Sequence, residues 1–474
     1  MNQKHYDILI LGGGEAGKYL AWTMAKLGKR SAVIERQYLG GSCPNVACLP
    51  SKNLIYSAHV AALTRRHQEF GISTGPISLD MGHVQERKQS MVQGLLALHA
   101  DRFDSSGAEL IWGEGRFCGD RKIRVALNDG GELTLTGERV FLNLGSRAAI
   151  PDIPGLRGSN PMTHVEALNL SEVPEHLVIL GGGYVGVEFA QAFRRLGSRV
   201  TLIARGSQLL SREDPDVALA VLALLEDEGV SVRLNCDVTA VEGRSGQAVE
   251  VNISSGGIRE TVTGTAILAA LGRTPNTSGI GLEDAGIEVT SSGHVRVNER
   301  LETSASQVWA MGECAGSPYF THASYDDFRV VRDNLNGHQR STSERTIPYC
   351  VFTDPPLARV GMNEREAQAL AVDYRIATMP IASVLRTRTI SESRGFMKAL
   401  VEAATGRILG FAAFGAESTE LMAAMQVAIL AGLSYSRLTD AVFAHPTMSE
   451  GLTFLFEGGV RVPTPIDSNG PGDF

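Results

Sequence analysis

Two cysteines, Cys43 and Cys48, are the residues of this chain best suited to redox chemistry. They follow a glycine pair and precede a Pro-Ser-Lys string. In a regular helix, positions i and i+5 lie roughly 8–9 Å apart at Cα, whereas a disulfide tolerates less than about 7 Å. If the two are bridged, Cys43 must lie just before, or at, a distorted helix start, where Pro44 is tolerated. A helix N-terminus stabilises a thiolate, so such a bridge would cycle between oxidised and reduced states.

The spacing alone leaves two other interpretations open, a metal-binding pair and an inert structural bridge. The other cysteines are scattered singly and supply no second pair for a zinc site. They are Cys118, Cys236, Cys314 and Cys350. A structural bridge is unusual in a chain whose cysteine use fits a reducing cytoplasm. Lys52 follows Cys48 by four residues and shares its helix face, although a lysine there can equally be a solvated charge.

Composition excludes several classes of function. The 474 residues carry a net charge of −8 and are 43% hydrophobic, as expected for two or three globular domains. The negative charge argues against nucleic acid as a partner. No apolar run is long enough to cross a membrane, and the N-terminus lacks the apolar core of a signal peptide. We therefore expect a cytoplasmic protein that binds neither nucleic acid nor membrane.

The N-terminus carries a glycine turn in the context of a dinucleotide-binding motif. The motif needs a strand, a G-x-G-x-x-G turn, a helix, a second strand and a final acid. The chain supplies these in order at residues 8–11, Gly12, Gly14 and Gly17, residues 18–27, residues 31–34, and Glu35. The glycines let the backbone approach a pyrophosphate, and the helix N-terminus attracts its charge. Glu35 is placed to accept hydrogen bonds from an adenosine ribose.

The same turn is repeated in the middle of the chain, with one change. Strands expected at 177–180 and 200–203 flank Gly181, Gly183 and Gly186. Counted from the first glycine, the position of Glu35 is taken here by Ala204, which Arg205 follows. Loss of the carboxylate removes repulsion toward a 2′-phosphate, and a guanidinium can pair with one. We therefore predict NADPH rather than NADH at this turn, with Arg212 as a second phosphate contact.

The remaining pattern predicts helices, then strands, and then a second group of strands near the C-terminus. We expect helices over 54–105 with a break near 71–76, strands over 108–140 with a hairpin at 129–131, and strands at 349–352, 396–402 and 408–415. Near the end, a carboxylate at Glu450 could orient His445 as a general acid–base. An isolated His near a Glu is more often a structural pair.

Together these strings resemble the class I pyridine nucleotide–disulfide oxidoreductases, which include dihydrolipoamide dehydrogenase, glutathione reductase and mercuric reductase. The resemblance covers most of the chain and implies an α/β fold. It implies two Rossmann-like dinucleotide-binding domains, for FAD and NAD(P), and a C-terminal α+β dimerisation domain. The implied bounds are 1–150 and 274–345 for the FAD-binding domain, 151–273 for the NAD(P)-binding domain, 346–460 for the dimerisation domain, and 461–474 for a disordered tail.

The resemblance also implies roles for single residues. Cys43 and Cys48 become a redox-active disulfide, with Lys52 and Glu188 as a buried pair beside the inner cysteine. Tyr184 resembles the tyrosine that covers the nicotinamide pocket in glutathione reductase. Further cofactor contacts are implied at Gly145, Gly272, Glu313 and Thr321. Two positions depart from the family pattern, since the family usually has Asp at 313 and Ala-Thr before the glycine at 145.

The implied reaction is FAD-dependent reduction of a small disulfide by NADPH. Hydride passes to FAD, the Cys43–Cys48 bridge opens, and Cys43 attacks the substrate. The His-Pro-Thr-x-x-Glu string containing His445 and Glu450 matches the family's catalytic dyad, which serves the other subunit's disulfide and implies a homodimer.

Two alternatives remain open. One is reduction of a metal ion, Hg(II) or Cu(II). Mercuric reductase needs a C-terminal cysteine pair, whereas the last cysteine here is Cys350. The Gly-Glu-Ala-Gly turn also loosely resembles the family's reactive-chlorine resistance reductases. The other alternative is a non-catalytic flavoprotein that serves as a binding partner. We expect no resident metal.

Overall fold

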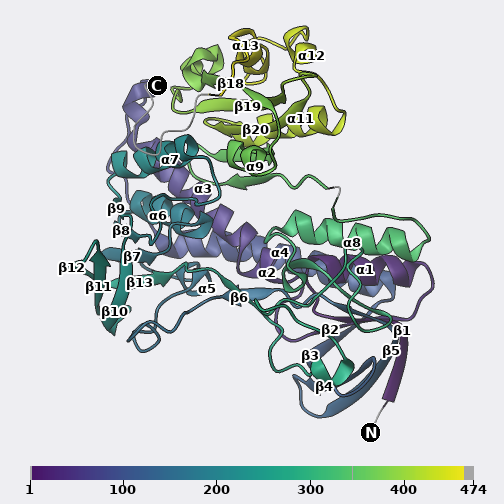
Figure 1. The fold of residues 1–474 in the computed structure, drawn as a ribbon. Helices are drawn as coiled ribbons and strands as arrows, with labels where there is room; N and C mark the ends of the chain where they lie inside the picture. Colours follow the sequence, from purple (N-terminus) through teal and green to yellow (C-terminus); the bar gives the residue numbers. More distant parts are fainter. Residues whose placement is uncertain (1–2, 344, 464–474) are drawn as a thin grey trace.

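Three large sheets organise the described chain, residues 3–343 and 345–463 of a computed structural model (Figure 1). The N-terminal sheet lies at the lower right of the view, the second sheet at the left, and the C-terminal sheet at the top. Strands and helices therefore alternate as the α/β prediction requires, and the C-terminal part has its own antiparallel sheet.

The first sheet is built around β1, which pairs in parallel with β2 and β5. Strand β15 joins in parallel beside β5, and β3 and β4 add an antiparallel arm. Helices α1 and α8 bury its apolar strands, as parallel strands require. Its elements are β1 (Gln3–Leu11), α1 (Glu15–Lys26), β2 (Ser31–Glu35), β3 (Glu109–Phe117), β4 (Lys122–Leu127), β5 (Glu132–Leu142), β15 (Val308–Ala310) and α8 (Thr321–Leu335).

The second sheet repeats this topology with four parallel strands in the order β13-β7-β8-β9. A three-stranded antiparallel sheet, β10-β11-β12, lies beside it. The elements are α5 (His164–Ala167), β7 (His176–Leu180), α6 (Tyr184–Leu196), β8 (Arg199–Ile203), α7 (Pro215–Asp227), β9 (Ser231–Arg233), β10 (Asp237–Arg244), β11 (Ala248–Ser255), β12 (Ile258–Gly264) and β13 (Ala266–Ala269).

The first glycine of each turn is needed for close packing. Gly12 has φ +102°, and a Cβ on it would lie 2.3 Å from the carbonyl oxygen of Asn143, just after β5. Gly181 has φ +114°, and its Cβ would lie 2.3 Å from the carbonyl oxygen of Ala270, just after β13. Only glycine fits such a backbone conformation and approach. The internal repeat inferred from spacing is thus a repeat of three-dimensional structure.

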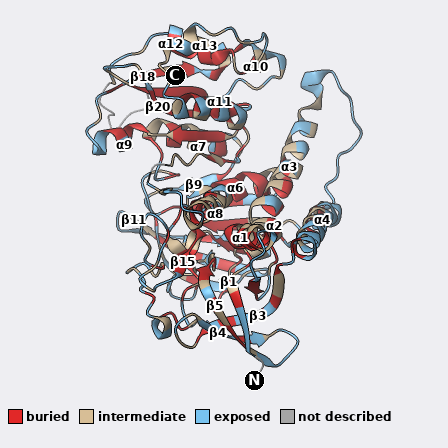
Figure 2. Cartoon of the chain, turned by 90° about the vertical axis from the view of Figure 1, so that its right-hand side faces the viewer, coloured by how far each residue is buried: buried red, intermediate tan, exposed pale blue. Residues whose placement is uncertain are grey.

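A helical hairpin joins the first two sheets and carries the cysteines. Helices α2 (Ser42–Asn45), α3 (Cys48–Arg65) and α4 (Met81–Ser106) follow β2, with a 3-10 turn at His67–Phe70. The buried face of α3 packs on α6 in the same apolar cluster, while the outer faces of α3 and α4 are largely exposed (Figure 2). The expected break near 71–76 is confirmed, since no helix spans residues 71–80.

The C-terminal sheet has five antiparallel strands in the order β16-β17-β20-β19-β18. Its elements are β16 (Tyr349–Val351), β17 (Leu357–Gly361), α9 (Glu364–Ala369), β18 (Tyr374–Pro380), α10 (Leu385–Thr389), β19 (Phe396–Glu402), β20 (Ile408–Phe414), α11 (Ser418–Leu430), α12 (Ser436–Thr439) and α13 (Gly451–Glu457). Arg461 still pairs with Ile376 of β18. The rest of the tail predicted to be disordered, 464–474, lies outside the described residues.

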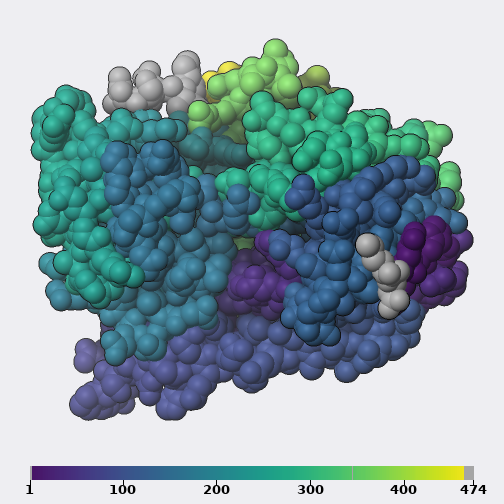
Figure 3. Space-filling model, turned by 90° about the horizontal axis from the view of Figure 1, so that it is seen from below, coloured from purple at the N-terminus to yellow at the C-terminus, as the bar shows by residue number. Residues whose placement is uncertain are grey.

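Short connections cross between the parts of the molecule. Strands β6 (Ser146–Ala148) and β14 (Arg273–Pro275) pair with each other where the chain leaves and re-enters the first part. Seen from below, purple atoms from near the N-terminus of the chain are visible between the teal atoms on the left and the blue atoms on the right (Figure 3). In the two described ranges, no helix is both long and apolar enough to span a bilayer.

Candidate active site

The two cysteines lie on either side of a break between two helices. Cys43 is in the four-residue helix α2, and Cys48 is the first residue of α3. Between them, Ala47 has φ −134° and ψ −104°, which is not helical. The distorted helix start expected from the spacing is therefore present. Both residues are free thiols of intermediate exposure in the structure.

The pKa values of the two thiols are shifted in opposite directions. A hydrogen bond from Cys43 lowers the pKa of Cys48 to about 6, and the same contact raises the pKa of Cys43. The Thr321 hydroxyl, 3.3 Å from the Cys48 sulfur, and the Lys52 ammonium lower the Cys48 pKa further, against the opposing effect of burial. The pair therefore holds one proton on Cys43 and a thiolate on Cys48, which is the more reactive form of a sulfur.

Lys52 and Glu188 form an ion pair beside Cys48. The Lys52 Nζ donates to Glu188 Oε2 at 2.8 Å, and the backbone N–H of Phe352 donates to Glu188 Oε1 at 2.9 Å. The Lys52 ammonium also lies 4.6 Å from the centre of the Phe352 ring, a favourable cation–π geometry. The Glu188 side chain is only 6% exposed. This ion pair fixes a positive charge near the thiolate.

Removing that charge should make Cys48 less acidic. In Lys52→Met we expect the pKa of Cys48 to rise from about 6 toward its ordinary range, because the ammonium is lost and the Glu188 carboxylate is left unpaired. The measurement is the pH dependence of iodoacetamide labelling at Cys48, followed by mass spectrometry. Lys52→Arg keeps the charge and is the matched control. An unchanged labelling midpoint in Lys52→Met would contradict the assignment.

Aromatic rings gather next to this site. Tyr184, the first residue of α6, lies 5.5 Å from the ring of Tyr349 and 6.4 Å from that of Phe320. Phe320 stacks on Tyr349 at 5.6 Å and directly precedes Thr321. Sequence reasoning found Tyr184 and Thr321 but missed the other two rings. No local pattern could indicate them, because they meet Tyr184 only through the fold.

His445 and Glu450 form a hydrogen-bonded pair just before α13. The distance from His445 Nδ1 to Glu450 Oε2 is 2.8 Å. The imidazole is 63% exposed, whereas the carboxylate is buried and its Oε1 has no partner among the described residues. Helix α13 lies at the top of the molecule and α2 near its middle (Figure 1). Within one chain, the dyad and the thiols therefore belong to different parts of the structure.

The first glycine turn can receive a dinucleotide. The N–H of Gly17 donates to Asn143 Oδ1 at 3.0 Å, which holds the N-terminus of α1 against the end of β5. Glu35 Oε2 accepts from the N–H of Gly13 at 2.7 Å, and its Oε1 accepts from two further amides. A carboxylate has about four lone-pair sites, so Glu35 retains acceptor capacity for a ribose. A Cβ on Gly145 would meet no atom of the described residues within 4 Å, which leaves room for a ligand there.

Glu313, one of the predicted cofactor contacts, also makes two contacts within the protein. Its Oε2 accepts a short hydrogen bond from the Ser146 hydroxyl and another from Arg273 Nε at 3.2 Å. Both partners lie on the β6–β14 pair, and neither was predicted. The carboxylate therefore contacts both strands of this pair.

The second glycine turn presents an open and basic surface. In the part of the chain that the structure describes, Cβ atoms on Gly183 and Gly272 would meet no atom within 4 Å, whereas one on Gly186 would lie 1.9 Å from a carbonyl oxygen. Ala204 is buried, and Arg205 and Arg212 are exposed. The turn therefore combines room for a nucleotide with two cations and no acid at the ribose position. Among the residues described, no group of three or more His, Cys, Asp or Glu is placed to hold a metal ion.

Comparisons with known proteins agree on one family. The sequence-family model described as pyridine nucleotide-disulphide oxidoreductase matches residues 6–327 of this chain. The model for the dimerisation domain of the same family matches residues 347–455. The chain is 38% identical over 458 residues to the probable pyridine nucleotide-disulfide oxidoreductase RclA of Escherichia coli, covering 95% of this chain and 98% of that protein. It is 31% identical to dihydrolipoyl dehydrogenase of Geobacillus stearothermophilus, covering 94% of each.

A solved structure agrees as well. The Cu(II) complex of the HOCl-induced flavoprotein disulfide reductase RclA from Escherichia coli superposes with a TM-score of 0.87 and 37% identity, covering 96% of this chain and 99% of that one. The family binds FAD and uses NAD(P)H. The chain belongs to the class I pyridine nucleotide–disulfide oxidoreductases, a family of flavin-dependent enzymes.

Proposed function

We propose that this chain is an NADPH-dependent disulfide reductase whose redox-active group is the Cys43–Cys48 pair. The observation that carries the proposal is the position of the two cysteines at the helix break, with the Thr321 hydroxyl 3.3 Å from the Cys48 sulfur and the Lys52–Glu188 ion pair beside it. These neighbours lower the pKa of Cys48, whereas that of Cys43 is raised. Such a pair suits two separate tasks, a stable thiolate and a thiol that is activated when substrate arrives. An inert structural bridge would need neither Thr321 nor Lys52 beside it.

FAD, when bound, carries electrons between the nicotinamide and the sulfurs, and the residues proposed to hold it are Gly12, Gly14, Gly17, Glu35, Gly145, Glu313 and Thr321. NADPH becomes NADP+, and the enzyme disulfide takes up two electrons and one proton, which leaves the Cys43 thiol and the Cys48 thiolate. Cys43 then attacks a small disulfide, which forms a mixed disulfide and releases one thiol. Cys48 attacks the Cys43 sulfur, which releases the second thiol and restores the enzyme disulfide.

The proton transfers are assigned to the dyad of a second subunit. His445 of the partner subunit would take the Cys43 proton and return it to the leaving thiol, while Glu450 orients the ring. The match to the dimerisation domain supports a homodimer. The C-terminal part also exposes apolar side chains that a second copy could cover: Val427, Leu430, Val442 and Phe454.

The nucleotide preference is proposed from the second glycine turn. Arg205→Glu should lower kcat/KM for NADPH by about tenfold or more, because a guanidinium–phosphate contact is replaced by repulsion. The value for NADH should fall less or rise. Steady-state rates with both nucleotides measure the effect. Arg199→Glu, an exposed change on β8 away from the turn, is the control. Equal NADPH-to-NADH ratios before and after Arg205→Glu would show that this arginine does not read the phosphate.

A metal ion is the second candidate acceptor. The related RclA has been solved as a Cu(II) complex, and this chain offers two free thiols with an imidazole brought by the partner subunit. The electron acceptor is tested by following NADPH oxidation with lipoamide, glutathione disulfide, other small disulfides, Hg(II) and Cu(II). Turnover with a small disulfide alone supports the first proposal. Turnover with a metal ion alone supports the second and removes the first.

The domain division follows from the same proposal. We assign 1–150 and 274–345 to FAD binding, 151–273 to NADPH binding and 346–460 to dimerisation. The β6–β14 pair, which lies next to both assigned boundaries, supports this division. The four cysteines outside the Cys43–Cys48 pair are free thiols, which supports action in a reducing cytoplasm.

A further inference from the structure

Glu213 is a buried carboxylate that follows Arg212, one of the proposed phosphate contacts, in the sequence. Arg212 is exposed, whereas its neighbour Glu213 is 1% exposed. The two residues share a peptide in the loop between β8 and α7. A shift of the backbone at Arg212 would therefore also change the position of Glu213.

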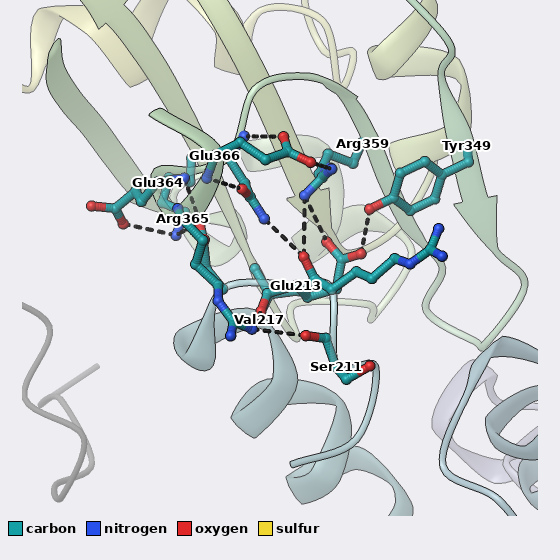
Figure 4. A network of polar contacts seen from close by, with 12 residues as sticks. Ser211, Glu213, Val217, Tyr349, Arg359, Glu364, Arg365 and Glu366 are labelled. Carbon is teal, nitrogen blue, oxygen red and sulfur yellow. Dashed lines mark hydrogen bonds and ion pairs between the residues drawn. The ribbon is translucent and has the colours of Figure 1, made fainter. Parts of the chain in front are cut away.

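The Glu213 carboxylate contacts a cross-strand pair of residues in the C-terminal sheet. Tyr349 of β16 and Arg359 of β17 are direct partners in the ladder. The Tyr349 hydroxyl donates a short hydrogen bond to Glu213 Oε1, and Figure 4 shows the hydroxyl and the guanidinium both directed at the carboxylate. Arg359 Nη1 lies 3.8 Å from Oε2, and Oε2 has no hydrogen-bond partner among the described residues. The position of the Glu213 carboxylate therefore depends on the hydrogen bond from the Tyr349 hydroxyl.

The same carboxylate oxygen reaches Tyr184, the residue that by resemblance would cover the nicotinamide pocket and that is called the gate below. The Tyr184 hydroxyl lies 3.5 Å from Glu213 Oε1, and its ring packs against Tyr349. Burial raises the pKa of Glu213, which reflects the cost of placing a charge here. A buried, incompletely paired acid is costly for stability and calls for a function.

Residues of the C-terminal part of the chain hold the loop that contains Arg212 and Glu213. Asn363 Nδ2 donates to the carbonyl oxygen of Arg212 at 2.9 Å. Arg365 Nη1 donates to that of Ser211 at 2.7 Å, and both of these residues are labelled in Figure 4. Lys398 pairs with Asp214 at 2.8 Å. These contacts define one resting position for the Arg212–Glu213 segment, and a shift caused by phosphate binding at Arg212 has to work against them.

We propose that Glu213 is a positioning residue that couples phosphate binding at Arg212 to the position of the Tyr184 ring. The inference rests on the proposed use of NADPH. A 2′-phosphate that draws Arg212 outward shifts the carboxylate shared by Tyr349 and Tyr184, and so favours one position of the gate. NADH lacks the phosphate and cannot supply this bias, since a ligand shifts an equilibrium only by its differential interaction. The two nucleotides should therefore differ in the rate of reduction at saturation as well as in affinity.

The first test uses Tyr349→Phe, which keeps the packed ring and removes only the hydroxyl. The ratio of saturating flavin-reduction rates, NADPH over NADH, should fall about tenfold. Adding Arg212→Gln to this variant should change the rate ratio no further, because the two sites act as one unit. Tyr374→Phe is the matched control. It loses a hydrogen bond to Glu364 in the same anchoring region and should leave the ratio at the wild-type value.

The second test does not depend on turnover. Adenosine 2′,5′-bisphosphate has no nicotinamide, so any effect on β16 must pass through the protein. It should slow hydrogen–deuterium exchange at Tyr349–Val351 in the wild type and fail to do so in Glu213→Ala. Equal loss of rate with both nucleotides in Tyr349→Phe, additive effects in the double variant, or no change in exchange would overturn the coupling. A wild type with the same rates and affinities for both nucleotides would instead remove the NADPH assignment, and the coupling with it.

Discussion

Cys43→Ser should abolish disulfide reduction while leaving the cofactor bound. We expect turnover with the substrate disulfide to fall by about three orders of magnitude or more, as is typical when the nucleophile is removed from catalytic residues that act together. The reason is that Cys43 is the thiol assigned to attack the substrate, and Cys48 has its sulfur held against Thr321. Flavin content and reduction by NADPH, measured by absorbance and stopped flow, should remain close to those of the wild type.

The control for this experiment is Cys118→Ser. Cys118 follows β3, far along the chain from the helix break, and donates to the carbonyl oxygen of Lys122. Its loss should leave turnover unchanged. Full turnover in Cys43→Ser would remove the interchange role. A loss of turnover in Cys118→Ser as large as that in Cys43→Ser would indicate a general effect on the fold.

His445→Ala should slow disulfide exchange by about 10²–10⁴-fold, the range typical of a lost general acid–base. The imidazole is exposed in the single chain and held by Glu450 at 2.8 Å, as required of a group that must reach a second subunit. Reduction of the flavin by NADPH should be affected little. Single-turnover stopped flow separates the two half-reactions.

Two further variants sharpen the interpretation. Glu450→Gln should give a smaller loss than His445→Ala, because the ring remains but its orientation is weakened. His83→Ala, at an exposed histidine near the start of α4, should have no effect. A His445→Ala enzyme slowed only at flavin reduction would contradict the role of the dyad in proton transfer.

Much of the fold could be predicted because its signals are local. The glycine turns, the apolar runs on either side of them and the spacing of Cys43 and Cys48 each specify structure within a few residues. The requirement for a distorted helix start followed from distances alone, and the break at Ala47 satisfies it. The pairing of Lys52 with Glu188 was different, since 136 residues separate them. Only the resemblance to a family indicated that pair.

The unpredicted part of the site comes from contacts between distant segments. Phe320, Tyr349 and Phe352 come from a loop, a strand and a linker that converge on α3 and α6 only in the fold. Glu313 was expected to face a cofactor, and its partners Ser146 and Arg273 are brought together by a two-stranded pairing with no pattern of its own. Such contacts depend on tertiary packing, which periodicity and spacing do not encode.

The most direct test of the account is to identify which thiols appear when the enzyme takes electrons from NADPH. The oxidised protein is alkylated before and after anaerobic addition of NADPH, and the labelled cysteines are located by mass spectrometry. We predict that Cys43 and Cys48 are protected before reduction and labelled after it, while labelling at the other four cysteines is unchanged. Equal labelling of Cys43 and Cys48 with and without NADPH would contradict the central claim that electrons enter this pair.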